Sequence, residues 1–343
     1  MDITYYHHPV DSISFSLVAQ QHIRAFRALG CKVCPVPLGA DMGRQTVPSD
    51  SVALVHPLFY AKGWDCLPFN DMMRCLAGKH RAIYGFEVAD GPQISAELVE
   101  WANHPDLSGI FLPSGASIAA FRDSGVSKEL VLVPHGFRRV TPSDRFAYLL
   151  RQPEPTVLSF FMSDLYRKGA DQLQYFVHRQ PAKRFIIKTN QVDYFRNLAS
   201  LPNVEVVSAW LPPADLASLY CSSDVYLSLH RGGAFELNCL EALLYGTKVV
   251  APEFGAVLDY LDDGNAFLVK VRENSRVSSM LYPHAGSYPD LNIEHGLQQL
   301  DHACQRQAGG ETTTEFNRAA YEDRYDWCRI CSELLGLLEP ASS

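Results

Sequence analysis

Two glycines and a glutamate in the stretch RGGAFELNCLEALLYG could bind a ligand rich in phosphate and hydroxyl groups. Gly232 and Gly233 follow the apolar run DVYLSL and precede a helical pattern that contains Glu241. Adjacent glycines allow a tight turn and let a ligand approach the backbone. The first N–H groups of a helix are unpaired and favour negative charge. The stretch therefore predicts a site for phosphate or sugar hydroxyls at a helix that begins near residues 234–235.

Glu241 would lie one to two turns into that helix, on the same face as Ala234, Leu237 and Asn238. A carboxylate repels phosphate, but it accepts hydrogen bonds from two neighbouring hydroxyl groups. Glu241 therefore suits the 2′/3′ diol of a ribose. The simpler alternative is a glycine loop of the kind that many α/β proteins carry before a helix, with Glu241 as an exposed charge.

A second stretch, VLSFFMSDLYRKGADQL, puts two cations directly after an apolar run. Arg167 and Lys168 could together neutralise a diphosphate, and arginine adds bidentate geometry. Lys188, at the end of RFIIKT, is a weaker candidate of the same kind. His230 and Arg231 precede the glycine pair and are candidates for the same site. The alternative for the two cations is a solvated basic pair with no ligand.

The first half of the chain also has polar residues where strand patterns end. Glu87 in IYGFEVADG is a candidate site residue, with Asp90 close by. Histidines occupy similar positions: His7, His8, His56 and His135. A structural carboxylate and hydrogen-bonded histidines are the alternatives. No group of His, Asp and Glu has the spacing of a metal site. Neither a G-x-S-x-G motif nor a P-loop occurs, so we expect no metal and no cofactor.

These candidates need elements that bring them together, and the chain alternates strand and helix patterns almost throughout. Such alternation predicts parallel sheets with helices on both faces, and ligands bind beyond the carboxyl ends of such strands. Residues 138–156, with prolines and mixed charge, interrupt the pattern. We therefore expect two doubly wound, Rossmann-like domains facing a cleft, residues 1–145 and 146–318, followed by an amphipathic helix within 319–343.

Composition excludes several classes of protein. The 343 residues are 47% hydrophobic and carry a formal net charge of −8, which argues against a nucleic-acid partner. No run approaches the ~18 apolar residues of a transmembrane helix. The start of the chain does not have the pattern of a secretory signal. The nine cysteines are scattered and odd in number, which predicts reduced thiols and a cytoplasmic location.

The stretch SDVYLSLHRGGAFELNCLEALLYGTKVVAPEFGAVLDYLDDGNAFLV resembles the retaining glycosyltransferases of family 4, which have the GT-B fold. RKGADQL is similar to the basic motif of the same domain. VEVVSAWLPPADLASLYCSSDVYLS is similar to the segment that leads into the donor site. FLPSGASIAAFRDSGVSKELVLVPHGF looks like the end of the family's first domain. YEDRYDWCRICSELL looks like the C-terminal helix that crosses back onto that domain. The resemblance runs from about Ile83 to Leu337 and is weak before Ile83.

The resemblance implies a metal-independent hexosyltransferase that transfers a sugar with retention. Its donor would be a nucleotide-diphosphate sugar, bound mainly by the second domain, and its acceptor a small molecule or glycan. Arg167 and Lys168 would hold the diphosphate, Glu241 would hold the ribose, and Glu87 would face the cleft. Glu87, Arg167 and Lys168 would be the catalytic residues. Segment 208–211 would flank the base. The remaining donor-site residues would be Lys188, Trp210, His230, Arg231, Gly232, Gly233, Ala234, Phe235, Glu236 and Leu237.

The sequence departs from the family pattern at one position of the donor motif. The family has two glutamates with seven residues between them, and that spacing from Glu241 leads back to Gly233. Glu236 precedes Glu241 by five residues, and on a continuous helix it would point about 140° away from Glu241. This departure motivates an alternative, a degenerate non-catalytic protein that binds nucleotide sugars. An epimerase or dehydrogenase is a further alternative, but no G-x-G-x-x-G follows an early strand.

Overall fold

The computed structural model describes residues 1–10, 13–39, 41–59, 67–274, 284–285, 287–305 and 316–338. These residues form two α/β units. Unit 1 holds the described parts of 1–136, residues 284–285 and residues 323–338, and unit 2 holds the described parts of 137–322 other than 284–285. The first division falls at Gly136 and Phe137 instead of residue 145, because the segment that follows packs in unit 2. There the Phe146 N–H donates to Ser218 Oγ at 3.2 Å, and the Val140 N–H donates to Tyr245 Oη at 3.1 Å.

Unit 1 is built on a six-stranded parallel sheet with the order β2-β1-β3-β4-β6-β7. The predicted strand patterns of the first half all form strands of this sheet. A short strand, β5, pairs antiparallel with β15. The bounds are β1 (Asp2–His7), β2 (Lys32–Pro37), β3 (Val52–His56), β4 (Ala82–Phe86), β5 (Gln93–Ile94), β6 (Gly109–Leu112), β7 (Leu130–Leu132) and β15 (His284–Ala285).

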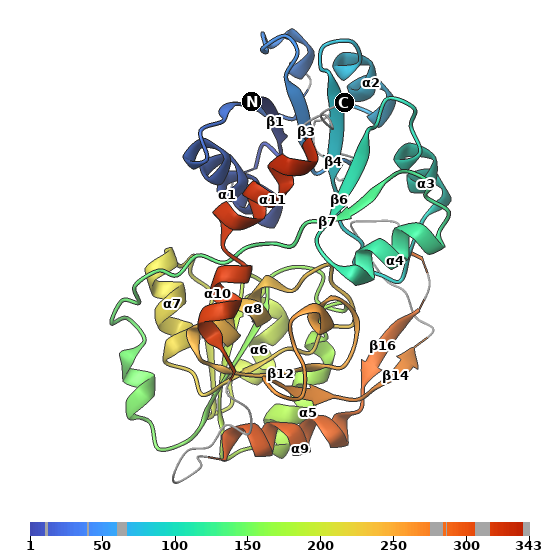
Figure 1. Cartoon of the computed structure of the whole chain (residues 1–343). Coiled ribbons are helices and arrows are strands. Elements are labelled where there is room, and N and C mark those ends of the chain that lie inside the picture. Colours follow the sequence, from blue (N-terminus) through green and yellow to red (C-terminus); the bar gives the residue numbers. More distant parts are fainter. Residues whose placement is uncertain are drawn as a thin grey trace. The chain divides into compact units, whose positions relative to one another are not determined.

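Helices cover both faces of the unit 1 sheet. Helices α1 and α11 lie on one face and α2, α3 and α4 on the other (Figure 1). Trp327 of α11 meets the ring of His22 of α1 edge-on at 5.2 Å, so the end of the chain packs on its beginning. The bounds are α1 (Ser14–Ala28), η1 (Met42–Arg44), α2 (Phe69–Leu76), α3 (Ala96–Ala102), α4 (Gly115–Asp123) and α11 (Trp327–Leu338).

Unit 2 is built on a second six-stranded parallel sheet, with the order β10-β9-β8-β11-β12-β13. An antiparallel pair, β14 and β16, follows it in the chain. The bounds are β8 (Thr156–Phe161), β9 (Arg184–Thr189), β10 (Val204–Val207), β11 (Val225–Leu227), β12 (Lys248–Pro252), β13 (Phe267–Val269), β14 (Val271–Asn274) and β16 (Tyr288–Leu291).

The helices of unit 2 follow the predicted alternation with three differences. The stretch VLDYL, where the alternation of patterns also predicts a helix, forms only a 3₁₀ turn, η4. The predicted terminal helix is divided into α10 and α11. Helix α9 and the β14–β16 pair fall in a region for which the sequence patterns above predict no element. The bounds are η2 (Ala147–Arg151), α5 (Ala170–Arg179), η3 (Val192–Phe195), α6 (Arg196–Ala199), α7 (Pro213–Cys221), α8 (Leu237–Tyr245), η4 (Gly255–Asp259), α9 (Ile293–Cys304) and α10 (Arg318–Arg324).

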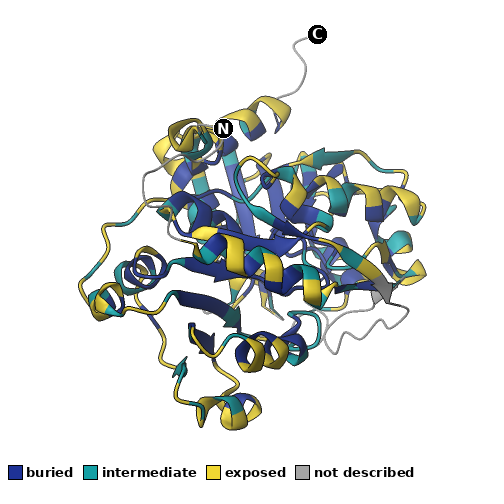
Figure 2. Ribbon diagram, turned by 90° about the horizontal axis from the view of Figure 1, so that it is seen from below, coloured by how far each residue is buried: buried dark blue, intermediate teal, exposed yellow. Residues whose placement is uncertain are grey.

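The central strands are apolar on both faces because helices cover both. Residues 52–55 are fully buried, and so are residues 157–158 of β8. Figure 2 shows buried strands and helices whose outward faces are exposed. Within the described residues, no helix has the length and apolar content needed to cross a membrane. Each sheet has one point where the strand order reverses, between β1 and β3 in unit 1 and between β8 and β11 in unit 2. Such switch points are where α/β sheets bind ligands.

Candidate functional site

The two stretches with candidate cations and glycines leave unit 2 at its switch point. Strands β8 and β11 are neighbours, with Val157 opposite Val225. The β8 loop (residues 162–169) and the β11 loop (residues 228–236) therefore emerge side by side at the carboxyl edge of the sheet. The Arg231 N–H donates to the Arg167 carbonyl at 2.7 Å and ties the two loops together. The structure thus brings together the two stretches that are far apart in the sequence.

Gly169 permits this close contact between the loops. It has a φ of +73°, and a Cβ at this position would lie 1.9 Å from the Leu229 carbonyl oxygen. Backbone cannot move away as a side chain can, so any larger residue would push the loops apart. Gly169 also directly precedes Ala170, the first residue of α5.

Arg167 and Lys168 lie in the β8 loop and are both paired with carboxylates. Arg167 Nε donates to Asp164 Oδ2 at 3.1 Å, and its Nη1 donates to the Gly232 carbonyl at 2.9 Å. Lys168 Nζ donates to Glu236 Oε1 at 2.6 Å. The exposed fractions of the two cationic side chains are 11% and 22%. The cations are thus held in fixed positions at the point where β8 and β11 leave the sheet.

Helix α8 begins at Leu237, so the prediction of a start near residues 234–235 is wrong by two to three residues. The physical reason is Glu236, which adopts the left-handed conformation with φ +57° and ψ +61°. Such a conformation is uncommon for a residue with a side chain. The Tyr260 hydroxyl stabilises it by contacts of 2.8 Å with the carbonyls of Phe235 and Glu236. The helical-wheel argument that turned Glu236 away from Glu241 therefore does not apply.

The carboxylate of Glu236 lies over Gly233. A Cβ on Gly233 would be 2.0 Å from Glu236 Oε1, so the carboxylate occupies the space that a side chain at position 233 would enter. The Glu236 side chain is only 4% exposed. Burial is the largest single influence and opposes its charge, but Lys168, His230 and Arg167 together outweigh it and lower the pKa of Glu236 to about 2. The group is thus a permanent carboxylate beside the cations.

Glu241 points from α8 toward α7. The Tyr220 hydroxyl donates to Glu241 Oε2 at 2.8 Å, and Asn238 Nδ2 donates to the Tyr220 oxygen at 2.9 Å. Burial raises the pKa of Glu241 to about 7, and the tyrosine hydrogen bond only partly offsets this effect. Glu241 is partly buried and hydrogen-bonded to Tyr220. It is therefore not the freely exposed charge of the simpler alternative. No feature of the sequence pointed to Tyr220 as its partner.

His230 and Arg231 have different surroundings from those of the two cations. Arg231 is 3% exposed, and its guanidinium makes a bidentate pair with Asp171 at 2.7 and 2.8 Å and donates to Asp290 at 2.6 Å. This geometry favours a role in joining the start of α5 to β16. His230 Nδ1 lies 2.8 Å from Ser228 Oγ, and burial lowers the pKa of His230 to about 4. His230 is therefore neutral at physiological pH.

Lys188 lies near the end of β9, and Trp210 follows the neighbouring strand β10. Lys188 of β9 is 5% exposed, its Nζ lies 4.0 Å from Met162 Sδ, and burial lowers its pKa. A buried ammonium beside a thioether gains from an anion nearby. Trp210, after β10, is 64% exposed. It offers an aromatic face at the carboxyl edge of the sheet.

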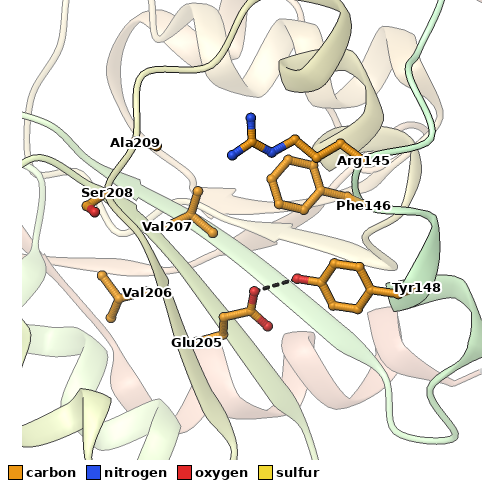
Figure 3. A pocket seen from close by; sticks show the side chains of 8 residues that line it. All are labelled: Arg145, Phe146, Tyr148, Glu205, Val206, Val207, Ser208 and Ala209. Carbon is orange, nitrogen blue, oxygen red and sulfur yellow. Dashed lines mark hydrogen bonds between the residues drawn. The ribbon is translucent and has the colours of Figure 1, made fainter.

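A pocket of about 350 Å³ lies along the edge strand β10 (Figure 3). Three of its polar lining groups are already paired: the Tyr148 hydroxyl donates to Glu205, which also lines the pocket, and Arg145 Nη1 donates to Asp215 Oδ2, outside the lining, at 2.8 Å. The pocket includes Ser208 and Ala209 of the segment predicted to flank a base, but no residue of the β8 or β11 loop. It is therefore a separate feature from the paired cations.

In unit 1, Glu87 directly follows β4 and is 2% exposed. Its Oε2 accepts from the Phe59 N–H at 2.5 Å and its Oε1 from the Val88 N–H at 2.9 Å. Burial nevertheless raises the pKa of Glu87 to about 8, more than these hydrogen bonds lower it. Glu87 is thus a buried, largely protonated acid at neutral pH that is held by the loop after β3.

The histidines of unit 1 are mostly buried and neutral. Tyr5 Oη lies 2.8 Å from His22 Nδ1 and 2.9 Å from His56 Nδ1, so one hydroxyl joins the two rings. Burial lowers the pKa values of His22, His56 and His8. His7 Nδ1 contacts the His8 carbonyl at 3.0 Å. Burial lowers the pKa of His135 to about 4. In the part of the chain that the structure describes, no three His, Cys, Asp or Glu side chains gather as a metal site.

Comparisons with known proteins agree on the fold. A solved sucrose-phosphate synthase from Thermosynechococcus elongatus matches with a TM-score of 0.71 at 14% identity, over 98% of both chains. An E. coli structure described as trehalose-6-phosphate bound with UDP-2-fluoro glucose matches with a TM-score of 0.69 at 12% identity, over 98% of this chain and 99% of that one. HepE of Anabaena, in complex with UDP-glucose, matches with a TM-score of 0.64 at 16% identity, over 98% and 99% of the two chains.

Two viral proteins are similar in sequence. "Uncharacterized protein 356" of Sulfolobus islandicus rod-shaped virus 1 is 25% identical over 98% of this chain and 97% of its own length. "Putative glycosyltransferase 45" of a Sulfolobus islandicus filamentous virus is 27% identical over 74% of this chain and 73% of its own. No family model matches the chain. The two parallel-sheet α/β units thus have the GT-B fold, which confirms the predicted fold class.

Proposed function

We propose that this chain is a glycosyltransferase that takes a sugar from a nucleotide-diphosphate donor bound in unit 2. The observation that carries the proposal is the junction of the β8 and β11 loops, which places Arg167 and Lys168 beside the start of α8. Two cations and a helix N-terminus together suit a diphosphate leaving group. The GT-B fold and the similarity to a viral protein named as a glycosyltransferase support this class of reaction.

In this proposal the parts of the donor have separate binding groups. Arg167 and Lys168 bind the diphosphate and stabilise the charge that develops as the sugar leaves. Glu241 accepts hydrogen bonds from the ribose hydroxyls, with Tyr220 fixing its orientation. The segment after β10, with Trp210, flanks the base. The backbone of residues 233–237 contacts the phosphates and the sugar.

The finer parts of the proposal follow the resemblance to family 4. Transfer proceeds with retention at the anomeric carbon, and Arg167 and Lys168 supply the positive charge for which other enzymes use a metal. The acceptor binds at the carboxyl edge of unit 1, where Glu87 and His56 are the candidate contacts. The structurally similar E. coli protein and HepE were solved with UDP-2-fluoro glucose and UDP-glucose, so UDP-glucose is the first donor to test.

The direct test is to follow UDP-, GDP- and ADP-glucose by proton NMR with the purified chain in EDTA. The proposal predicts slow hydrolysis of one α-linked donor, with α-glucose as the first product, and faster consumption when an acceptor is present. Arg167→Ala with Lys168→Ala should abolish the signal. First release of β-glucose would contradict retention. Binding of a donor with no turnover under any condition would instead favour a protein that only binds nucleotide sugars.

A further inference from the structure

The charges at the loop junction of unit 2 balance within the site. Arg167 is paired with Asp164, and Lys168 with Glu236, so two cations face two carboxylates. Arg167 Nη1 also lies 4.0 Å from Glu236 Oε1, which places this one carboxylate beside both cations. A diphosphate that approaches this junction therefore meets a group with no net charge. The carboxylates of Asp164 and Glu236 already neutralise the two cations that would otherwise attract a diphosphate.

The position of Glu236 also places it where a donor would bind. Its carboxylate lies over Gly233, between Lys168 and the backbone that leads into α8. The left-handed backbone of Glu236 turns the side chain back onto the loop, and a Cβ on residue 233 would collide with it. A diphosphate cannot contact Lys168 and the backbone at Gly233 while the carboxylate stays there, because like charges repel at contact distance.

We propose that Glu236 is an internal counter-ion of Lys168 that a donor diphosphate displaces, so that this carboxylate determines how tightly the site binds diphosphates. The inference rests on the proposed function, because it concerns the same site. A diphosphate carries more charge than one carboxylate and offers several acceptor oxygens, so it can replace Glu236 at Lys168. The exchange lowers affinity for the diphosphate and holds Lys168 in place before the donor arrives. The freed glutamate chain has rotatable bonds through which to move aside.

Two variants remove the counter-ion by different routes. Glu236→Gln keeps the size of the side chain but removes its charge. It should tighten binding of inorganic pyrophosphate and of UDP by about tenfold, because Lys168 no longer exchanges one anion for another. Glu236→Asn also removes the charge but shortens the side chain, and asparagine tolerates the left-handed backbone at this position. It should tighten both ligands by a similar factor. Isothermal titration of the full chain measures both.

Asp193→Asn is the matched control. It makes the same change in net charge as Glu236→Gln in the same unit, and Asp193 is 90% exposed and pairs with the exposed Arg196. It leaves Glu236 on Lys168 and Asp164 on Arg167, so it should not tighten pyrophosphate binding. An equal gain in Asp193→Asn and Glu236→Gln would overturn the inference in favour of a general charge effect. Unchanged or weaker pyrophosphate binding in a folded Glu236→Gln protein would also overturn it.

A different result would contradict the proposed function itself. UDP, GDP and ADP binding that is absent from the wild type and from every variant would remove the nucleotide site and this inference with it. Nucleotide binding that depends on Glu241, with pyrophosphate affinity indifferent to Glu236, would keep the proposed function and overturn the counter-ion alone. Circular dichroism of each variant confirms that it is folded before titration.

Discussion

Each unit is built on its own six-stranded parallel sheet with one switch point. The carboxyl edge of one sheet carries charged polar groups, and that of the other carries largely neutral ones. At the edge of unit 2, salt bridges stabilise the charged forms of Arg167, Lys168 and Glu236. At the edge of unit 1, burial favours the neutral forms of Glu87 and His56. The same topology therefore supports a permanently charged edge in one unit and a largely neutral edge in the other.

The difference arises from the partners that each edge provides. Lys168 at 2.6 Å and Arg167 at 4.0 Å help to compensate the cost of burying Glu236, whereas Glu87 has backbone N–H groups as its partners in the contacts described above. Backbone dipoles stabilise a carboxylate less than a buried ammonium does. A charged edge suits an anionic ligand such as a diphosphate, and a neutral edge suits hydroxyl groups. Variants at the edge of each unit test this difference.

The largest effect is expected where the two loops of unit 2 meet. Gly169→Ala places a methyl group 1.9 Å from the Leu229 carbonyl at a positive φ. We expect it to lower the free energy of unfolding by about 4 kcal/mol. Urea denaturation measures this change. Gly30→Ala is the control, because it has a φ of +85° with no atom within 4 Å. It should cost only about 1 kcal/mol. Equal losses would show that the loop junction is not tightly packed.

The next effect concerns the charged edge directly. Arg167→Ala with Lys168→Ala should weaken binding of the preferred nucleoside diphosphate by about 100-fold or more, since two charge-assisted contacts are lost. Titration calorimetry measures the ratio of Kd values. Arg196→Ala is the control in the same unit, because its side chain is 78% exposed and pairs only with the exposed Asp193 in the contacts described. An unchanged Kd in the double variant would mean that the donor site has been assigned wrongly.

Glu241→Gln should have a smaller and more selective effect. We expect about tenfold weaker binding of the ribonucleotide and little change for its 2′-deoxy form, since only the diol contacts are lost. Because the pKa of Glu241 is raised to about 7, wild-type affinity should increase as pH rises through 7, when the carboxylate forms. The variant should lack this dependence. Titrations at pH 6 and pH 8 with both nucleotides measure it. A pH dependence that survives in the variant would point to another group.

The smallest effect is expected at the neutral edge. Burial raises the pKa of Glu87 from 4.5 to about 8, so the folded chain holds a proton that the unfolded chain releases. The stability that this proton supplies is present below pH 4.5 and is lost as pH rises through 8. Unfolding free energy should therefore fall more steeply with pH in wild type than in Glu87→Gln. Urea denaturation from pH 5 to pH 9 compares them, and parallel curves would contradict a protonated Glu87.

The fold was accessible from the sequence because strand and helix periods are local signals. The apolar runs around Leu227 and Phe160 end where strands end, and Gly169 and Gly246 lie at boundaries of α5 and α8. Helix α9 was missed, although Leu297 and Leu300 have helical spacing and Asn292 caps its first turn. These signals were present in the sequence. They were missed because no strand pattern follows this helix, so the alternation of strands and helices did not predict it.

The details of the site were less accessible because they depend on contacts between distant residues. The left-handed conformation of Glu236 breaks the helical pattern that runs through AFELNCLEALL, and contacts with Tyr260 and Lys168, distant in sequence, stabilise it. Arg231 precedes the glycine pair in sequence, yet its partner Asp290 comes from β16. Spacing along one helix identifies Glu241 as a candidate, but not its hydrogen bond with Tyr220.

The central claim is that unit 2 binds a nucleoside diphosphate, and a thermal-shift screen tests it most directly. The purified chain is heated with UDP, GDP, ADP and their glucose conjugates at millimolar concentration in EDTA. A ligand that binds only the folded state raises the Tm. We expect a rise with one nucleotide, and loss of that rise in Glu241→Ala. An unchanged Tm with all of these ligands would contradict it.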